Sequence, residues 1–178
     1  MEEPLRGYFT RSTVTRVAAV LRDGGVAVLP TDTIYGLHCA ASHPAALRRI
    51  QRIKKTANRA GFILIASDME MVDRLVGRWP RGARELLGRT WPAPLTAILP
   101  ASKIIDPAIV PTGTIAVRIP ALAELRRCVK LVGQPCASTS VNLSGRKPLT
   151  RMSDILRGIP GLDGYISQRG RPSMKPST

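Results

Sequence analysis

Two clusters of uncharged polar residues follow stretches that the sequence predicts to be strands. The first, residues 30–37, reads PTDTIYGL and comes directly after the apolar run 26–29. If the chain stays extended there, Thr31 and Thr33 project to the same side, because side chains alternate along a strand. Their hydroxyls and the intervening carboxylate can hydrogen-bond a small polar ligand, although a local turn or a helix cap uses the same residue types.

The second cluster, residues 138–145, reads STSVNLSG. Its Ser138, Ser140 and Asn142 alternate, so an extended chain places all three on one side. Hydroxyls and an amide supply hydrogen-bond donors and acceptors without net charge. This combination is typical of a site that recognises a ligand through hydrogen bonds, and a polar surface loop is the simpler alternative.

Arg118 is the one charged residue in the otherwise apolar stretch 114–120, TIAVRIP. An unpaired guanidinium is costly to bury, so this side chain must face solvent or an anionic ligand. A guanidinium binds a carboxylate through two parallel hydrogen bonds, which makes a carboxylate a suitable partner. On an edge strand the side chain would instead extend to water.

The elements that position these residues alternate between strands and helices. Apolar spacing predicts helices over residues 14–21, 44–53, 67–75, 80–87 and 122–132, and a short one around residue 155. Strands are predicted at residues 26–29, 62–66, 95–99, 114–119, 135–138 and 164–167. Such alternation indicates a single α/β domain. The sheet need not be purely parallel, because the connection between residues 99 and 114 shows no clear crossover helix.

Composition narrows the class of protein. The 178 residues include 27 Lys and Arg against 12 Asp and Glu, a formal net charge of +15 that attracts polyanions such as nucleotides or RNA. An apolar share of 44 % excludes wholesale disorder. No apolar run approaches the ~20 residues of a membrane span. The acidic start MEEPLRGYF lacks the apolar segment of a secretory signal, so a cytoplasmic location is expected.

Several common catalytic motifs are missing from the sequence. It contains no Walker-type phosphate loop, no glycine-rich dinucleotide motif, and neither GxSxG nor HExxH. Cys39, Cys128 and Cys136 form no CxxC pair, so we expect buried reduced thiols and no protein-bound metal. The two histidines, His38 and His43, are expected at a polar loop or the edge of the core rather than in a catalytic triad.

Six segments together resemble the YrdC-like domain of the threonylcarbamoyl-AMP synthase family. In family order they are residues 30–37, Lys54 after a basic helix, and residues 61–67, 91–96, 114–120 and 138–145, followed by the closing 176–178. The resemblance implies a YrdC-like domain over residues 8–178, with an N-terminal extension of residues 1–7. Its fold would be a twisted mixed sheet with flanking helices and a basic concave cleft, as in the short, single-domain bacterial type.

The resemblance also implies an activity. Members of this nucleotidyltransferase family convert L-threonine, bicarbonate and ATP, with Mg²⁺ carried by the nucleotide, into threonylcarbamoyl-adenylate and pyrophosphate. Other tRNA threonylcarbamoylation proteins then pass the threonylcarbamoyl group to adenosine 37 of tRNA. Contact of tRNA or double-stranded RNA with the basic cleft is a further expectation.

Roles carry over at the matching positions. The resemblance implies threonine binding by Thr33, Arg118, Ser138 and Ser140. It implies nucleotide binding by Lys54, Thr56, Thr114, Ser140, Asn142 and Pro148, and catalysis by Lys54, Ser140 and Asn142.

One position departs from the family pattern. Relatives read Lys-x-Arg-Pro where this chain has Lys54, Lys55, Thr56 and Ala57. The change removes a cation from a triphosphate site unless Lys55 or Arg59 replaces it. A weakened or non-catalytic paralogue that binds RNA is therefore the alternative function. A carbamoyl-transfer domain of the hydrogenase-maturation type is another, although such domains occur in longer chains with zinc motifs.

Overall fold

A computed structural model describes residues 5–55, 62–103, 105, 112–142 and 147–167. In chain order its elements are β1 (Leu5–Tyr8), α1 (Arg11–Arg22), β2 (Ala27–Leu29), β3 (Gly36–Ala40), α2 (Pro44–Lys54), β4 (Ile63–Ile65), α3 (Met69–Leu75), α4 (Ala83–Thr90), β5 (Ala97–Pro100), β6 (Thr114–Arg118), α5 (Ala123–Val132), β7 (Cys136–Ser140), α6 (Met152–Gly158) and β8 (Gly164–Ser167). The predicted α/β domain with a mixed sheet is confirmed.

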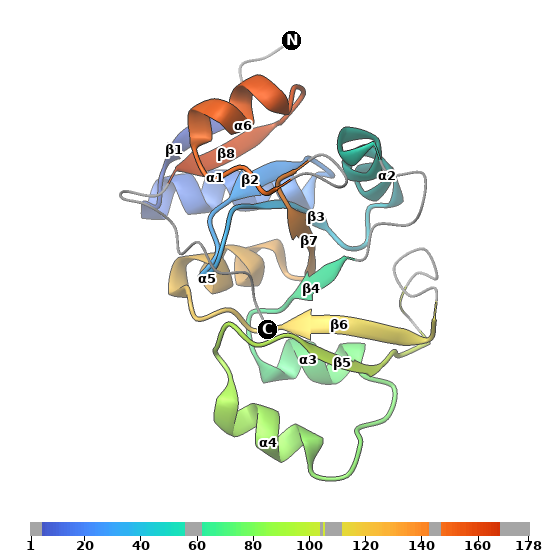
Figure 1. Ribbon diagram of the computed structural model, residues 1–178. Helices are drawn as coiled ribbons and strands as arrows, with labels where there is room; N and C mark the ends of the chain where they lie inside the picture. The colour runs from blue at the N-terminus through green and yellow to red at the C-terminus, as the bar shows by residue number, and fades with distance from the viewer. Residues whose placement is uncertain (1–4, 56–61, 104, 106–111, 143–146, 168–178) are drawn as a thin grey trace.

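Within the described residues the strands form one eight-stranded sheet of order β1-β8-β2-β3-β7-β4-β6-β5. The central strands β2, β3, β7 and β4 pair antiparallel, whereas β8 pairs parallel with β1 and β2, and β4 pairs parallel with β6. Figure 1 shows the sheet running from β1 and β8 at the top to β6 and β5 near the bottom, with α4 beyond them. The middle of the sheet therefore joins segments from both halves of the chain.

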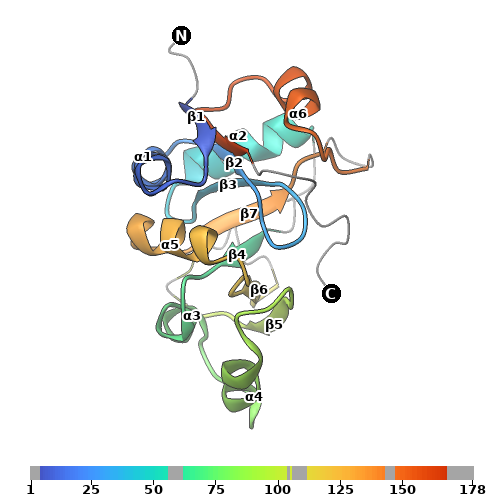
Figure 2. The same ribbon diagram turned by 90° about the vertical axis from the view of Figure 1, so that its left-hand side faces the viewer.

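Helix α1 illustrates how the sequence pattern becomes packing. Val14, Val17, Ala18 and Leu21 recur at helical spacing, and all four are buried. Thr10 caps the helix by accepting a hydrogen bond from the backbone N–H of Thr13 at 3.1 Å. The helix packs against α5 on one side of the molecule (Figure 2), and α2 packs against β3. Together the helices and the sheet enclose a core that consists mainly of aliphatic side chains.

Two strands were not predicted from the sequence. Strand β1 pairs in parallel with β8, so the domain boundary expected between residues 7 and 8 falls inside a strand of the sheet. Strand β3 begins within the last two residues of the first polar cluster, and all five of its residues are buried. It pairs with β2 on one side and β7 on the other, which makes it the link between the two polar clusters.

Candidate active site

The register of the central strands places polar residues of both clusters on one face of the sheet. Residues that pair directly across neighbouring strands share a face. Gly36 of β3 lies opposite Ser140 of β7, and Ile65 of β4 lies opposite Arg118 of β6. The pairing of β7 with β4 puts Ser138 on the same face as Ile65. Four strands that are distant in sequence thus build one continuous surface.

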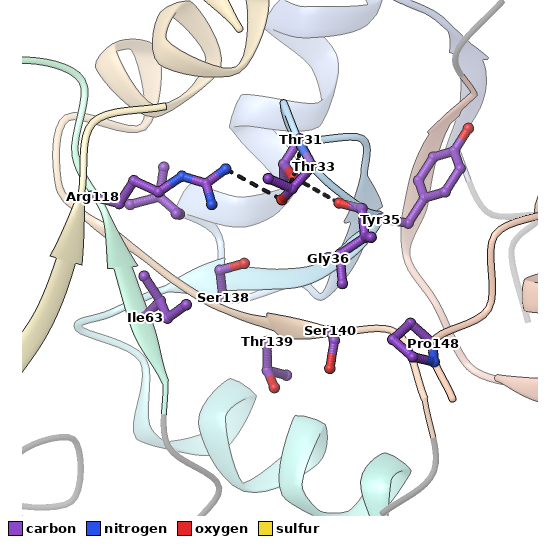
Figure 3. A pocket seen from close by; sticks show the side chains of 12 residues that line it. Thr31, Thr33, Tyr35, Gly36, Ile63, Arg118, Ser138, Thr139, Ser140 and Pro148 are labelled. Carbon is purple, nitrogen blue, oxygen red and sulfur yellow. Dashed lines mark hydrogen bonds between the residues drawn. The ribbon is translucent and has the colours of Figure 1, made fainter. Parts of the chain in front are cut away.

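A cavity of about 300 Å³ lies over this surface (Figure 3). Its lining includes five residues that the sequence predicted for the site: Thr33, Arg118, Ser138, Ser140 and Pro148. It also includes Thr31, whose hydroxyl the sequence offered as a ligand contact beside that of Thr33. The other lining residues were not singled out as binding residues: Ile34, Tyr35, Gly36, Ile63, Ile65 and Thr139. Hydroxyls on an apolar wall, with one cation, suit a small polar ligand that carries a negative charge.

The first polar cluster forms a turn that also lines the cavity. The Thr31 hydroxyl donates to the carbonyl of Ile34 at 2.7 Å, so its oxygen accepts at 2.9 Å from the hydroxyl of Thr33. The backbone N–H of Thr33 donates to the same oxygen at 3.1 Å. The local turn and the ligand site were alternatives in sequence analysis. In the structure the turn fixes the side chains that face the cavity.

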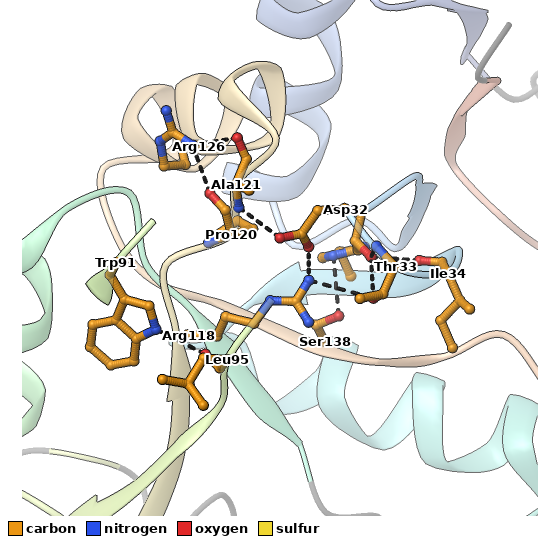
Figure 4. A network of polar contacts seen from close by, with 12 residues as sticks. Asp32, Thr33, Ile34, Trp91, Leu95, Arg118, Pro120, Ala121, Arg126 and Ser138 are labelled. Carbon is orange, nitrogen blue, oxygen red and sulfur yellow. Dashed lines mark hydrogen bonds and ion pairs between the residues drawn. The ribbon is translucent and has the colours of Figure 1, made fainter. Parts of the chain in front are cut away.

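Arg118 ends strand β6 and is only 3 % exposed. Figure 4 shows its Nη2 donating to Asp32, whose other carboxylate oxygen accepts from the backbone N–H of Ala121 at 2.7 Å. Burial lowers the pKa of Arg118 to about 10, so the guanidinium remains charged at neutral pH. Within the part of the chain that the structure describes, its Nε has no hydrogen-bond partner. Of the two alternatives that the sequence left open for Arg118, the side chain extending to water is wrong, because Arg118 is buried at the cavity wall.

Lys54, Ser140 and Asn142 meet beside the cavity. Lys54 is the last residue of α2, and its Nζ donates to the carbonyl of Ser140 at 2.8 Å and to Oδ1 of Asn142 at 2.7 Å. The Ser140 hydroxyl donates to the same Oδ1 at 2.6 Å. Burial lowers the pKa of the Lys54 ammonium, which is 6 % exposed. The three residues predicted to be catalytic are therefore in direct contact.

Of the residues predicted to bind the nucleotide, Thr114 lies apart from this cluster and Thr56 lies outside the described residues. Thr114 begins β6 on the same face as Arg118 but four residues earlier, roughly 13 Å along the strand, and it does not line the cavity. Thr56, Arg59 and the segments 143–145 and 176–178 lie outside the described residues.

His38 is a site neighbour that sequence analysis placed elsewhere. It lies in the middle of β3 and is fully buried, rather than in a polar loop or at the edge of the core, and burial lowers its pKa to about 4. Its Nδ1 is 2.9 Å from the carbonyl of Gly36 and its Nε2 is 3.1 Å from the hydroxyl of Ser138. The contact of His38 with Ser138 follows from the register of β3 against β7, and no sequence pattern indicates that register.

The described residues also bear on the expectations for cysteines, metal ligands and membrane spans. Cys39, Cys128 and Cys136 are buried free thiols, and burial raises the pKa of Cys39 and of Cys128 to about 12. Among the residues with described positions, no group of three or more His, Cys, Asp or Glu could hold a metal ion. None of the described helices is long and apolar enough to cross a membrane.

The fold and the cavity define an α/β protein with a hydroxyl-lined cavity, suited to a small anionic ligand, beside a lysine–serine–asparagine cluster. A family model described as Telomere recombination, covering the Sua5, YciO and YrdC proteins, matches residues 19–178. The chain belongs to this family. The resemblance inferred from the sequence is thereby confirmed.

Individual relatives support the predicted activity. The chain is 37 % identical over 166 residues to the threonylcarbamoyl-AMP synthase of Chromobacterium violaceum, covering 89 % of this chain and 84 % of that protein. P. abyssi Sua5 complexed with L-threonine superposes with a TM-score of 0.84 at 27 % identity, covering 96 % of this chain. This chain spans 50 % of that longer protein. E. coli YciO, at 23 % identity and a TM-score of 0.83, shares the fold.

These relatives bear on the alternatives that the sequence left open. The match to a named synthase extends over most of both chains, and it confirms the predicted threonylcarbamoyl-AMP synthase function, a nucleotidyltransferase activity. It favours an enzyme over a non-catalytic RNA-binding module. The roles of individual residues remain predictions.

Proposed function

We propose that this chain joins L-threonine, bicarbonate and ATP into threonylcarbamoyl-adenylate in the cavity over β3, β7, β4 and β6. The observation that carries the proposal is a buried guanidinium with an unpartnered Nε, within the described residues, at the wall of a hydroxyl-lined cavity. A buried ammonium lies beside the same cavity through its contacts with Ser140. The guanidinium of Arg118 can bind a carboxylate, and the ammonium of Lys54 can offset the charge of a polyphosphate.

Arg118 and Thr33 form the threonine end of the proposed site. Among the described residues one carboxylate, Asp32, offsets the charge of Arg118, and its buried Nε–H has no acceptor. A threonine carboxylate would supply that acceptor. Ser138 and Ser140 provide hydroxyls for the polar groups of the same molecule. The bound L-threonine of P. abyssi Sua5 supports the assignment by similarity.

Lys54, Ser140 and Asn142 form the nucleotide end. The Lys54 ammonium can offset charge on the phosphates, and Pro148 lines the adjoining wall. Thr114 lies further along the same face, as a ligand longer than threonine requires. Mg²⁺ would arrive as MgATP; the described residues that line the cavity include no carboxylate. In phosphoryl transfer, positioning and charge neutralisation provide most of the catalysis.

The proposed reaction has two steps that balance. The threonine nitrogen bonds to the carbon of bicarbonate, with loss of water, and gives a carbamate. A carbamate oxygen then bonds to the α-phosphorus of ATP while the bond to pyrophosphate breaks. Because a carbamate decomposes readily in water, both substrates must be held together, which adjacent binding in one cavity allows.

The wider role follows from the product. Threonylcarbamoyl-adenylate would be consumed by other proteins that transfer its threonylcarbamoyl group to tRNA, and we expect this to occur in the cytoplasm. Direct contact with tRNA is a separate proposal that depends on the formal charge of +15.

Pyrophosphate release tests the proposed function. Purified protein is expected to release pyrophosphate when threonine, bicarbonate and MgATP are all present, and not when any one is omitted. Mass spectrometry should detect threonylcarbamoyl-adenylate in the complete mixture. Equal release without threonine would contradict the proposal. RNA binding by folded protein that releases no pyrophosphate would establish the non-catalytic alternative.

A further inference from the structure

A chain of two hydrogen bonds runs along the cavity-facing side of the sheet, from strand β7 to strand β3. The Ser138 hydroxyl is 3.1 Å from Nε2 of His38, and Nδ1 of His38 is 2.9 Å from the carbonyl oxygen of Gly36. His38 and Ser138 are direct partners in the β3–β7 register. Figure 3 shows the Ser138 side chain on the cavity floor, with Arg118 on one side and Gly36 on the other.

The Gly36 carbonyl determines where the proton of His38 lies. A carbonyl oxygen only accepts hydrogen bonds, so Nδ1 must carry the proton in this pair. Burial lowers the pKa of His38 to about 4, so the ring is neutral near pH 7. Nε2 of a neutral ring protonated at Nδ1 has only a lone pair, and it therefore accepts from the Ser138 hydroxyl. The Ser138 proton is directed into the core.

We propose that His38 is a positioning residue that makes Ser138 an obligate hydrogen-bond acceptor toward the cavity. With its proton held by His38, the Ser138 oxygen can only accept, and it selects an N–H or O–H group of the substrate. Arg118 at the same cavity is a pure donor and selects a carboxylate. The pair thus recognises a molecule with a carboxylate and a nearby donor, as an amino acid has. This inference rests on the proposed function.

The residue at position 36 is part of this arrangement. A Cβ on Gly36 would lie 2.6 Å from Cε1 of His38 and 2.9 Å from the hydroxyl oxygen of Ser138. Any larger residue would therefore push the ring and the hydroxyl out of their present positions. Gly36 supplies the carbonyl that sets the tautomer and the space that the ring occupies.

Orientation, rather than proton removal, is the role that the geometry supports. Protonating His38 would place a positive charge on a fully buried ring. The described hydrogen-bond partners of the ring are the Gly36 carbonyl and the Ser138 hydroxyl, and neither is a carboxylate. The cost of burying that charge makes His38 a poor base for the threonine ammonium. Its effect should appear in amino-acid affinity and leave ATP affinity unchanged.

A double-mutant cycle tests the proposal. Threonine affinity is measured by calorimetry for wild type, His38→Phe, Ser138→Ala and the double variant, and ATP affinity is measured in parallel. We expect His38→Phe to weaken threonine binding about five- to tenfold, the effect of one hydrogen bond. In the Ser138→Ala background the same change should have no effect on threonine affinity. His38→Gln, which keeps an acceptor, should restore part of the loss.

The choice of ligand and control sharpens the result. Repeating the cycle with 2-aminobutyrate, which lacks the threonine hydroxyl, identifies the donor that Ser138 accepts. A coupling seen with both ligands assigns the amine, and a coupling seen with threonine alone assigns the hydroxyl. His43→Phe is the matched control, because His43 contacts the carbonyl of Arg22 rather than the cavity. It should leave threonine affinity unchanged.

Nitrogen NMR of the wild-type ring tests the same proposal without a variant. The His38 signals should report a neutral ring with the proton on Nδ1. A proton on Nε2, or equal losses of threonine affinity in both backgrounds, would overturn the proposal. Failure of wild-type protein to bind threonine would instead overturn the proposed function, and the two failures are therefore distinguishable.

Discussion

At Arg118 a charge that is costly to bury is held by one carboxylate. Asp32 pairs with its Nη2 and is itself anchored by the backbone N–H of Ala121. Removing one partner of a buried ion pair typically costs ~3–5 kcal/mol of stability. Truncation of Arg118 would therefore mix a folding defect with a binding defect, and a substitution that keeps the charge separates them.

Arg118→Lys should weaken threonine binding selectively. The ammonium keeps the positive charge but loses the planar fork and the Nε that can donate to a carboxylate. We expect a loss of ~1.5–3 kcal/mol in threonine affinity with unchanged ATP affinity, measured by calorimetry. Arg127→Lys, at an exposed position on α5, is the control. Unchanged threonine affinity in folded Arg118→Lys would show that the carboxylate binds elsewhere.

Adjacent lysines at the end of α2 allow a second matched comparison. Lys54 contacts Ser140 and Asn142, whereas Lys55 is exposed one residue later. Lys54→Met keeps the aliphatic stem and removes the ammonium, so kcat/KM for ATP should fall about 10- to 100-fold. Lys55→Met should have little effect in the same steady-state assay. The opposite ranking would assign the phosphate contact to Lys55.

At the level of strands and helices, local pattern predicted most elements but not those decided by pairing. Strands that contain Ile or Val in an apolar run, such as β4 and β6, stand out in the sequence. Strand β3 reads GLHCA, with no β-branched residue and no alternation, because it is buried on both faces. Helix α4 was expected to end at Gly88 and continues to Thr90, since one glycine costs a helix only ~1 kcal/mol.

In the candidate site, too, local sequence pattern indicated single residues but not the contacts that strand pairing creates. Thr33, Arg118 and Ser140 were found because polar residues at strand ends are conspicuous in an apolar context. Their partners were not, because these contacts join distant parts of the chain. Asp32 is 86 residues from Arg118, and His38 is 100 residues from Ser138. Only the strand order brings them together, and the sequence does not state it.

Substitution of Gly36 tests how tightly the side chains of β3 and β7 pack around this position. Gly36→Ala places a Cβ 2.6 Å from His38, so the ring must shift within a packed core. Overpacking of this kind costs ~1–3 kcal/mol, which urea denaturation should detect. Gly88→Ala is the control, because nothing lies within 4 Å of its added Cβ in helix α4. It should stabilise the protein by about 0.4–1 kcal/mol. Equal effects would contradict the packing argument.

The stability of the whole protein should depend on pH through His38. Its pKa is lowered from 6.5 to about 4 by burial, so between these values the unfolded chain takes up a proton that the folded one does not. The free energy of unfolding should therefore fall as pH drops from 6.5 to 4, by up to about 3 kcal/mol. Denaturation of wild type and His38→Gln across this range isolates the effect, since carboxylate titrations are common to both. Parallel curves would show that His38 does not titrate differently on folding.

The net charge of +15 predicts RNA binding that is controlled by salt. Each phosphate that a Lys or Arg neutralises releases counterions, and this release becomes less favourable as salt rises. For six such contacts, RNA affinity should fall about 10³-fold when salt is raised from 50 to 200 mM. Threonine affinity should change far less, because Arg118 is buried and screened less by ions. Electrophoretic mobility shift with tRNA and with double-stranded RNA, across a salt series, measures the slope.

The position of the RNA can be located by comparing two helices. Arg48 and Arg52 are exposed on α2, the helix that ends at Lys54. Arg89 is exposed on α4, which Figure 1 places at the far end of the molecule. If RNA approaches the nucleotide end of the cavity, replacing Arg48 and Arg52 by Ala should reduce the magnitude of the salt slope by about two. Arg89→Ala should leave it unchanged. A salt-independent affinity, or equal effects at both helices, would show that the charge excess serves no RNA contact near the site.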